Sequence, residues 1–106
     1  MPFIDTTAMR QTEKRPGWFG RIFHSPSMTF AHWDFAAGAE IHPHDHEQEE
    51  VWHILDGQLQ VTIGDETVIA GPGMVAVIPA HTRHAVKALT AGKSIVVDHP
   101  IRPGFG

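Results

Sequence analysis

The segment 38–57 constrains the fold of this chain more than any other, because it places three potential metal ligands at short, even spacing. His44 and His46 are two residues apart, and Glu50 follows four residues after His46. Side chains alternate between the two faces of an extended strand, so residues of the same parity point the same way. The segment therefore predicts two imidazoles and a carboxylate that converge on one point, a mixed nitrogen and oxygen set that suits a divalent transition metal.

This parity argument requires that the chain stays extended, or bends cleanly, between His46 and Glu50. His42 shares the parity of the three residues, and we expect it at the rim of the same pocket. His53 has the opposite parity and is predicted to face away from a metal. The odd residues between the ligands form a predicted solvated strip: Asp45, Glu47 and Glu49.

Composition bounds the function classes that remain. The chain has 106 residues, the length of one ordinary domain, and a formal net charge of -4 with no basic run, which argues against nucleic-acid and anionic-membrane surfaces. It has no stretch of membrane-spanning length and no signal-type apolar segment at its N-terminus, so a cytoplasmic location is the expectation. Cysteine is absent, which excludes a thiolate metal site, and histidine, the chief neutral nitrogen ligand for metals, occurs 9 times.

Short apolar runs separated by Gly and Pro turns predict an all-β fold. Asp56-Gly57 is a typical two-residue hairpin signal, and no window shows a helical period. We expect a loose arm at 1–16, with a short edge strand at 2–5, and an irregular tail at 99–106. The predicted strands are 18–23, 28–36, 51–55, 58–63, 66–70, 74–78, 84–89 and 93–98. The whole chain, 1–106, is predicted to be a single sandwich or barrel domain.

Two motifs within 38–84 resemble the signatures of the cupin family. The first family motif is Gly, five residues, His-x-His, three or four residues, Glu, six residues, Gly. The second is Gly, five residues, Pro-x-Gly, two residues, His, three residues, Asn; here His81 replaces its middle Gly and Ala88 its Asn. The matching residues are Gly38, His44, His46, Glu50 and Gly57 for the first motif, and Gly73, Pro79 and His84 for the second.

The resemblance is to small single-domain cupins of the RmlC-like, Cupin_2 type. It implies a jelly-roll barrel, a double-stranded β-helix, in which His44, His46, Glu50 and His84 bind one divalent transition metal: Fe, Mn, Ni or Zn. Only closure of the sheets could bring His84 to Glu50, 34 residues earlier. Three His and one Glu leave two positions open on an octahedral metal, whereas zinc prefers four ligands in total.

We therefore expect a small-molecule metalloenzyme, either a dioxygenase or an isomerase or hydratase that acts on a small sugar acid. The alternative is a non-catalytic cupin module that binds or senses a metal or ligand, because fold does not imply function. The expected ligand is small and anionic. Small cupins commonly dimerise, so we also expect a homodimer with residues 1–23 at the interface.

The C-terminal tail gives the sugar-acid hypothesis its sequence basis. Pro100 and Arg102 resemble the Pro-x-Arg of short cupins that convert unsaturated uronates; those proteins also carry Asp and Phe upstream, where this chain has Val96 and Asp98. Two prolines stiffen the tail, so Arg102 could bind a substrate carboxylate, with Phe105 as an anchor. The predicted pocket residues besides the ligands are Trp52, Arg102 and His42.

Overall fold

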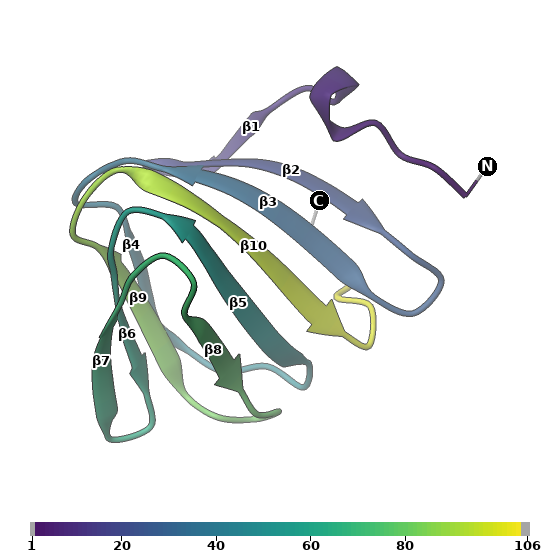
Figure 1. The fold of residues 1–106 in the computed structure, drawn as a ribbon. Coiled ribbons are helices and arrows are strands. Elements are labelled where there is room, and N and C mark those ends of the chain that lie inside the picture. The colour runs from purple at the N-terminus through teal and green to yellow at the C-terminus, as the bar shows by residue number, and fades with distance from the viewer. Residues whose placement is uncertain (1, 105–106) are drawn as a thin grey trace.

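The computed structural model describes residues 2–104, which form β-strands and one short 3-10 helix (Figure 1). The helix, η1, is Thr6–Ala8. The strands are β1 (Thr12–Arg15), β2 (Trp18–His24), β3 (Thr29–Phe35), β4 (Glu40–His44), β5 (Glu49–Asp56), β6 (Leu59–Ile63), β7 (Glu66–Ala70), β8 (Val75–Ile78), β9 (His84–Ala88) and β10 (Gly92–His99). Within this range, no helix is long and apolar enough to span a membrane.

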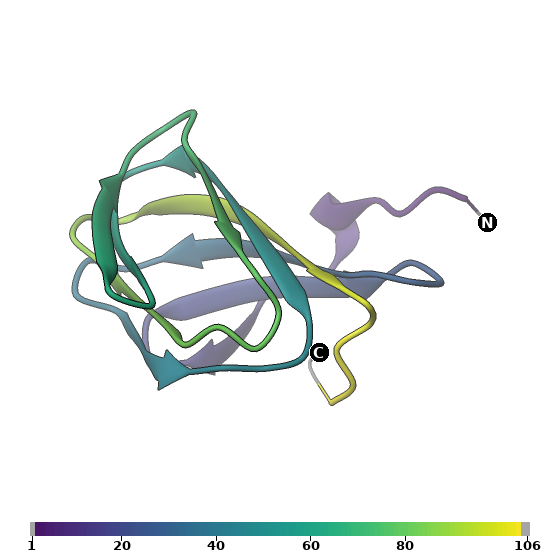
Figure 2. The ribbon, with the colours of Figure 1, turned by 90° about the horizontal axis from the view of Figure 1, so that it is seen from below.

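The strands form two antiparallel sheets that face each other (Figures 1 and 2). One has six strands in the order β1-β2-β3-β10-β5-β8, and the other has four in the order β4-β9-β6-β7. Strands far apart in sequence pair within each sheet, as β10 does between β3 and β5. The architecture confirms the predicted all-β jelly roll.

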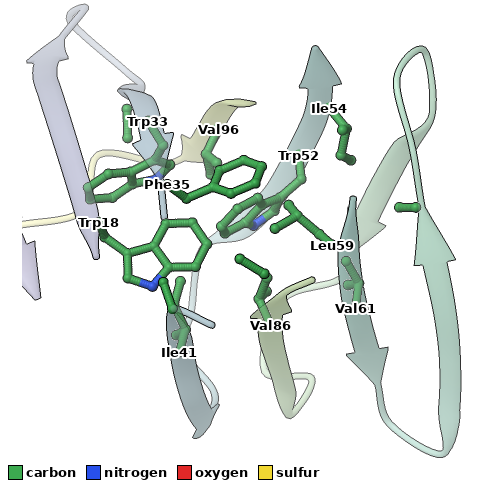
Figure 3. Packing of buried hydrophobic residues seen from close by; sticks show 14 of the residues in the cluster. Trp18, Trp33, Phe35, Ile41, Trp52, Ile54, Leu59, Val61, Val86 and Val96 are labelled. Atoms are coloured by element: carbon green, nitrogen blue, oxygen red, sulfur yellow. The ribbon is translucent and has the colours of Figure 1, made fainter. Parts of the chain in front are cut away.

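An aromatic cluster fills the space between the sheets (Figure 3). The Trp18 ring lies 5.8 Å from the rings of both Trp33 and Trp52 in edge-to-face contacts, and 5.5 Å from Phe35. Every second residue of β3 is buried, as expected for a strand with one face on the core. Such aromatic pairs add to the stabilisation from burial.

The N-terminal arm differs from the prediction. The edge strand is β1, Thr12–Arg15, and residues 2–5 belong to no strand. Gly17, with φ of 82°, lies in the turn that brings β1 back along β2. This turn brings residues 12–15 to the edge of β2. They form an antiparallel pair with β2 there although they are polar and lack an apolar alternation.

The tail was expected to be irregular from residue 99, but His99 still belongs to β10; the described residues after it, 100–104, contain no strand or helix. Two of the hydrogen bonds that hold it against the barrel use backbone groups of the tail. The Gln48 side-chain amide donates to the Ile101 carbonyl at 3.2 Å, and the Arg102 backbone N–H donates to the Thr29 hydroxyl at 2.9 Å. Phe105, the predicted anchor, lies outside the described residues.

Candidate metal centre

The four residues of the predicted ligand set come together from both sheets. His44 ends β4 and His84 begins β9 in the four-stranded sheet, Glu50 lies on β5 in the six-stranded sheet, and His46 lies in the loop between β4 and β5. Glu50 Oε1 is 3.3 Å from His46 Nε2, and Glu50 Oε2 is 3.4 Å from His84 Nε2. The His44 and His84 rings are 4.3 Å apart.

Backbone carbonyls orient all three imidazoles in the same way. The Nδ1 atoms of His44, His46 and His84 lie 2.9, 3.0 and 2.8 Å from the carbonyl oxygens of His42, Gln48 and Thr82, respectively. A carbonyl can only accept a hydrogen bond, so each Nδ1 carries the proton and each Nε2 keeps its lone pair in the neutral ring. Nε2 of His46 and of His84 is buried without a hydrogen-bond partner. Metal-binding histidines are typically oriented in this way.

These atoms are close enough to share one ion. One nitrogen each of His44, His46 and His84 lie within 4.8 Å of one another, and the same limit joins His46, Glu50 and Asp98. Buried polar atoms without a partner are costly. Lone pairs of neutral imidazoles beside a carboxylate are the donors that divalent transition metals take. The residues present therefore fit the metal that the motifs imply.

Glu50 is a buried carboxylate that keeps its charge. The Trp52 indole N–H donates to Oε2 at 2.6 Å, and Nη1 of Arg102 is 3.4 Å from Oε1. Burial by itself would raise the pKa of Glu50, but the neighbouring His46, His84, Asp98 and Trp52 side chains stabilise the carboxylate and hold its pKa below the ordinary value. A charged oxygen ligand is therefore available at neutral pH.

The same network moves the pKa values of two histidines in opposite directions. Burial lowers the pKa of His44. Burial would also lower the pKa of His84, but the protonated ring would donate to Glu50 as well as to the Thr82 carbonyl, and these interactions, together with the Glu50 charge, raise the pKa above its usual value. In the metal-free protein, His84 therefore takes up a proton before His44 does.

Asp98 is a member of the site that neither sequence motif includes. It lies on β10, is 2% exposed, and its Oδ2 is 3.5 Å from Nη1 of Arg102. Burial is the main cause that raises the pKa of Asp98 to about 8, and the adjacent Glu50 carboxylate raises it further. The signal was present in the strand parity, because Asp98 shares its inward face with buried Ser94 and Val96.

A cavity of about 20 Å³ adjoins these groups inside the barrel. His44, Glu50 and His84 form one wall, and Trp18, Trp33 and Trp52 form much of another. Arg102, Asp98 and Arg15 also line it. A space of this size holds about one water or one ion, so a larger ligand requires side chains at the mouth to move.

Two of the three predicted pocket residues line this cavity, and the third does not. Trp52 and Arg102 face it, whereas His42 is exposed and lines a hollow on the outer side of β4. The pairing of β4 with β9 shifts register between Ile41 and His44, which breaks the parity that placed His42 beside the ligands. Ile41 takes the inward position instead. His53 is exposed, facing away from the site.

His81 occupies the loop position where the second cupin motif has Gly. Its φ is 59°, in the left-handed region that favours Gly. Its backbone N–H donates to the carbonyl of His46 at 2.8 Å. This hydrogen bond joins the β8–β9 loop to the loop that carries one of the candidate ligands.

The fold and the paired motifs define the class of protein. The family model described as "Cupin domain" (Cupin_2) matches residues 31–99, well over half of the chain. This protein therefore belongs to the cupin domain family. A comparison with curated protein sequences gave no match.

Solved structures show the same fold over the whole chain. KdgF from Halomonas sp. is 25% identical, with a TM-score of 0.89 over 97% of this chain and 96% of that chain. An RmlC-like cupin from Shewanella frigidimarina is 20% identical, with a TM-score of 0.93 over 100% and 96%. Oxalate decarboxylase from Bacillus subtilis, a protein with Mn(II) centres, is 20% identical, with a TM-score of 0.79 over 97% of this chain and 30% of that chain.

Proposed function

We propose that this cupin is a small-molecule metalloenzyme in which His44, His46, Glu50 and His84 hold one divalent transition metal. The observation that carries the proposal is the pair of buried, unpartnered Nε2 atoms of His46 and His84 beside the charged Glu50. The hydrogen bond of each Nδ1 to a carbonyl supports it, because it aims the free nitrogens before any ion arrives. When bound, the metal would supply a Lewis acid or a centre that activates dioxygen.

The side chains around the candidate centre favour a small anionic substrate. Arg102 is 20% exposed in its side chain and lies at the cavity with its guanidinium between Glu50 and Asp98. A guanidinium can bind a carboxylate through two hydrogen bonds. We infer that Arg102 turns from these two residues to a substrate carboxylate as the ligand enters, which would also enlarge the cavity.

Among the possible reactions, we favour isomerisation or hydration of a small sugar acid. In the metal-free protein Asp98 holds a proton at neutral pH, since burial and the adjacent Glu50 raise its pKa to about 8, and its Oδ1 is buried without a hydrogen-bond partner. A carboxyl group in that state can donate a proton to a substrate and take one back. The tryptophan walls would exclude water from the reacting atoms. The likeness to KdgF, at 25% identity over nearly the full length of both chains, is consistent with this choice.

Two other functions remain candidates. A dioxygenase would use the two positions that three His and one Glu leave open on an octahedral metal. A non-catalytic binding or sensing module is favoured by one specific observation, the cavity volume of about 20 Å³, which leaves little room for a substrate.

Metal titration tests the centre itself. Purified apoprotein would be titrated calorimetrically with Mn(II), Ni(II), Zn(II) and, without oxygen, Fe(II). We expect one equivalent to bind, and His84→Ala and Glu50→Gln to weaken binding at least tenfold. His53→Ala, which removes an exposed histidine from the same strand as Glu50, should bind as the parent does. Equal affinity in all four proteins would contradict the proposed centre.

Substrate tests separate the three functions. Metal-loaded protein would be incubated with unsaturated uronates and related keto acids while substrate and dioxygen are followed. Substrate loss without dioxygen uptake supports the isomerase or hydratase, uptake supports a dioxygenase, and binding without turnover supports the module. Arg102→Ala should keep its metal and lose about 2 kcal/mol of ligand affinity. The exposed Arg83→Ala is the matched control.

A further inference from the structure

A β-bulge in the first strand turns Arg15 toward the interior of the barrel. Glu13 lies opposite Phe19 of β2, and the register then shifts by one residue. As a result Arg15 lies opposite Trp18, where a regular pair would place Lys14. Side chains opposite each other in an antiparallel pair point to the same face, and Trp18 is completely buried in the core. The bulge therefore re-aims Arg15, as bulges beside binding sites often do.

The side chain of Arg15 lies at the cavity of the candidate metal centre. Arg15 is half-buried, whereas the three residues before it in β1 are exposed, and it lines the cavity. Within residues 2–104, its guanidinium has no hydrogen bond or ion pair. The acidic residue of the same strand, Glu13, accepts a hydrogen bond from the Gly17 backbone N–H at 3.0 Å. The Arg15 guanidinium is therefore available to an anionic ligand.

Arg15 and Arg102 reach the cavity from opposite ends of the six-stranded sheet. Through β2 and β3, the pairing registers connect Arg15 to Gly92 at the start of β10. Arg102 contacts Asp98 near the end of that strand, which is roughly 20 Å further along at 3.3 Å per residue. Figures 1 and 2 show the tail leaving β10 at the end of the sheet opposite the β1–β2 turn. One cavity therefore lies between two guanidiniums.

The charges around this cavity favour a ligand with two negative charges. In the described chain, its acidic lining residues are Glu50 and Asp98, and its arginines are Arg15 and Arg102. Even with both carboxyl groups ionised, the two guanidiniums would balance them, and a bound divalent metal would leave two positive charges. Charge without a partner is costly away from water, so a dianion complements the site better than a monoanion.

We propose that Arg15 determines specificity by binding a second carboxylate, and that the substrate is a small sugar acid with a carboxylate at each end. The inference rests on the proposed function, because it assigns the first carboxylate to Arg102 beside the metal. The guanidinium of Arg15 binds the far carboxylate through two parallel hydrogen bonds. Trp18, which lies beside Arg15 and lines the cavity, packs against the carbon chain between the two acids.

The small volume of the cavity is compatible with this assignment. A space of about 20 Å³ holds one water, so the ligand must displace side chains as it enters. The side chain of Arg102 is 20% exposed, and Arg15 on its edge strand is half-buried. Both arginines therefore lie where they can move outward with the ligand, whereas the tryptophans behind them are packed in the core.

Binding of D-glucarate and D-gluconate tests the proposal. The two acids share one linear chain of hydroxyl groups and differ at one end, where glucarate has a carboxylate and gluconate has an alcohol. Calorimetric titration of the full chain, both metal-free and loaded with Zn(II), gives the ratio of their affinities. We expect the parent to bind glucarate at least about tenfold more tightly than gluconate, the effect of one additional charged hydrogen-bonded pair.

Variants of Arg15 assign the preference to this residue. Arg15→Gln should reduce the ratio to below about twofold by weakening glucarate, since one charged hydrogen-bonded pair is lost. Arg15→Lys should keep part of the ratio, because it retains the charge without the paired geometry. Arg10→Gln removes an exposed arginine from the same arm and should bind both acids as the parent does. Circular dichroism shows whether each variant folds.

The outcomes separate this proposal from the proposed function. Equal affinity of the parent for the two acids, binding of neither, or an Arg15→Gln protein that keeps the parent ratio would overturn the role of Arg15. If Arg102→Ala still weakens both acids in that case, the proposed function stands without it. Conversely, a glucarate preference that Arg15→Gln removes in a protein that binds no metal would support Arg15 and contradict the metal centre.

Discussion

At the scale of single residues, the protonation of the three imidazoles should control metal affinity. A histidine must be neutral to bind a metal, so protons compete with the ion. The pKa of His84 lies above its usual 6.5 and that of His44 lies below it. Competition at His84 therefore begins above pH 6.5, and His44 adds to it only at lower pH.

We expect the apparent metal association constant to fall as the pH decreases from 8 to 5. The loss should approach about tenfold per pH unit below the pKa of His84 and become steeper once His44 also titrates. Calorimetric titration with Zn(II) at pH 8, 7, 6 and 5, in buffers of equal ionic strength, measures this. A constant affinity over that range would exclude imidazole ligands.

His81 makes a prediction about stability. A left-handed conformation costs a residue with a side chain about 1–2 kcal/mol. Replacement by Gly removes this strain, but Gly also makes the unfolded chain more flexible, which offsets part of the gain in stability. His81→Gly should therefore raise the free energy of unfolding by about 0.5–1 kcal/mol. Arg83→Gly is the control, because Arg83 lies in the same loop. His81 is the only non-Gly residue with positive φ in 2–104, so Arg83→Gly relieves no backbone strain and should lower the free energy of unfolding. Urea denaturation measures the free energy of unfolding of both variants. A His81→Gly protein less stable than the parent would show that His81 is not strained.

At the scale of elements, the two glycines of the first cupin motif serve different needs. Both Gly38 and Gly57 have positive φ, at 86° and 81°. A Cβ atom on Gly38 would meet nothing within 4 Å, whereas one on Gly57 would lie 2.4 Å from the Ala91 carbonyl oxygen. Gly57 is therefore needed for its conformation and for the close approach of the β5–β6 and β9–β10 turns.

Alanine substitution should separate these two effects. Gly38→Ala should cost about 1–2 kcal/mol of unfolding free energy, from backbone strain alone. Gly57→Ala should cost more, by roughly another 1–3 kcal/mol, because the backbone at Ala91 must also shift. Urea denaturation of both variants tests the order. Equal losses, or a larger loss for Gly38→Ala, would show that the turn contact is not tight.

The elements also show what sequence patterns can and cannot reveal. β7 was predicted with its observed bounds, 66–70, because turn signals flank it on both sides. β1 was missed because Thr-Glu-Lys-Arg carries no apolar alternation, and only its pairing with β2 makes it a strand. The displacement of His42 follows from a register shift between paired strands, which a single strand's parity cannot reveal.

At the scale of the whole molecule, closure of the two sheets assembles the candidate site. The motifs predicted which residues meet, and the structure brings His84 to 3.4 Å from Glu50. Strand parity places Asp98 on the inward face of β10, but its position beside Glu50 and Arg102 depends on β10 lying beside β5 and on the tail returning to the mouth. Contacts that join three distant segments leave no local pattern, so those parts of the site required the structure.

The central claim is that one divalent metal lies among His44, His46, Glu50 and His84. Anomalous diffraction from crystals of metal-loaded protein, recorded on both sides of the absorption edge of that metal, tests it most directly. The account predicts one anomalous peak about 2.1 Å from Nε2 of each of the three histidines, rising slightly for larger ions, with a Glu50 oxygen in the same coordination sphere. A peak elsewhere, or none among these side chains in crystals shown to contain the metal, would contradict it.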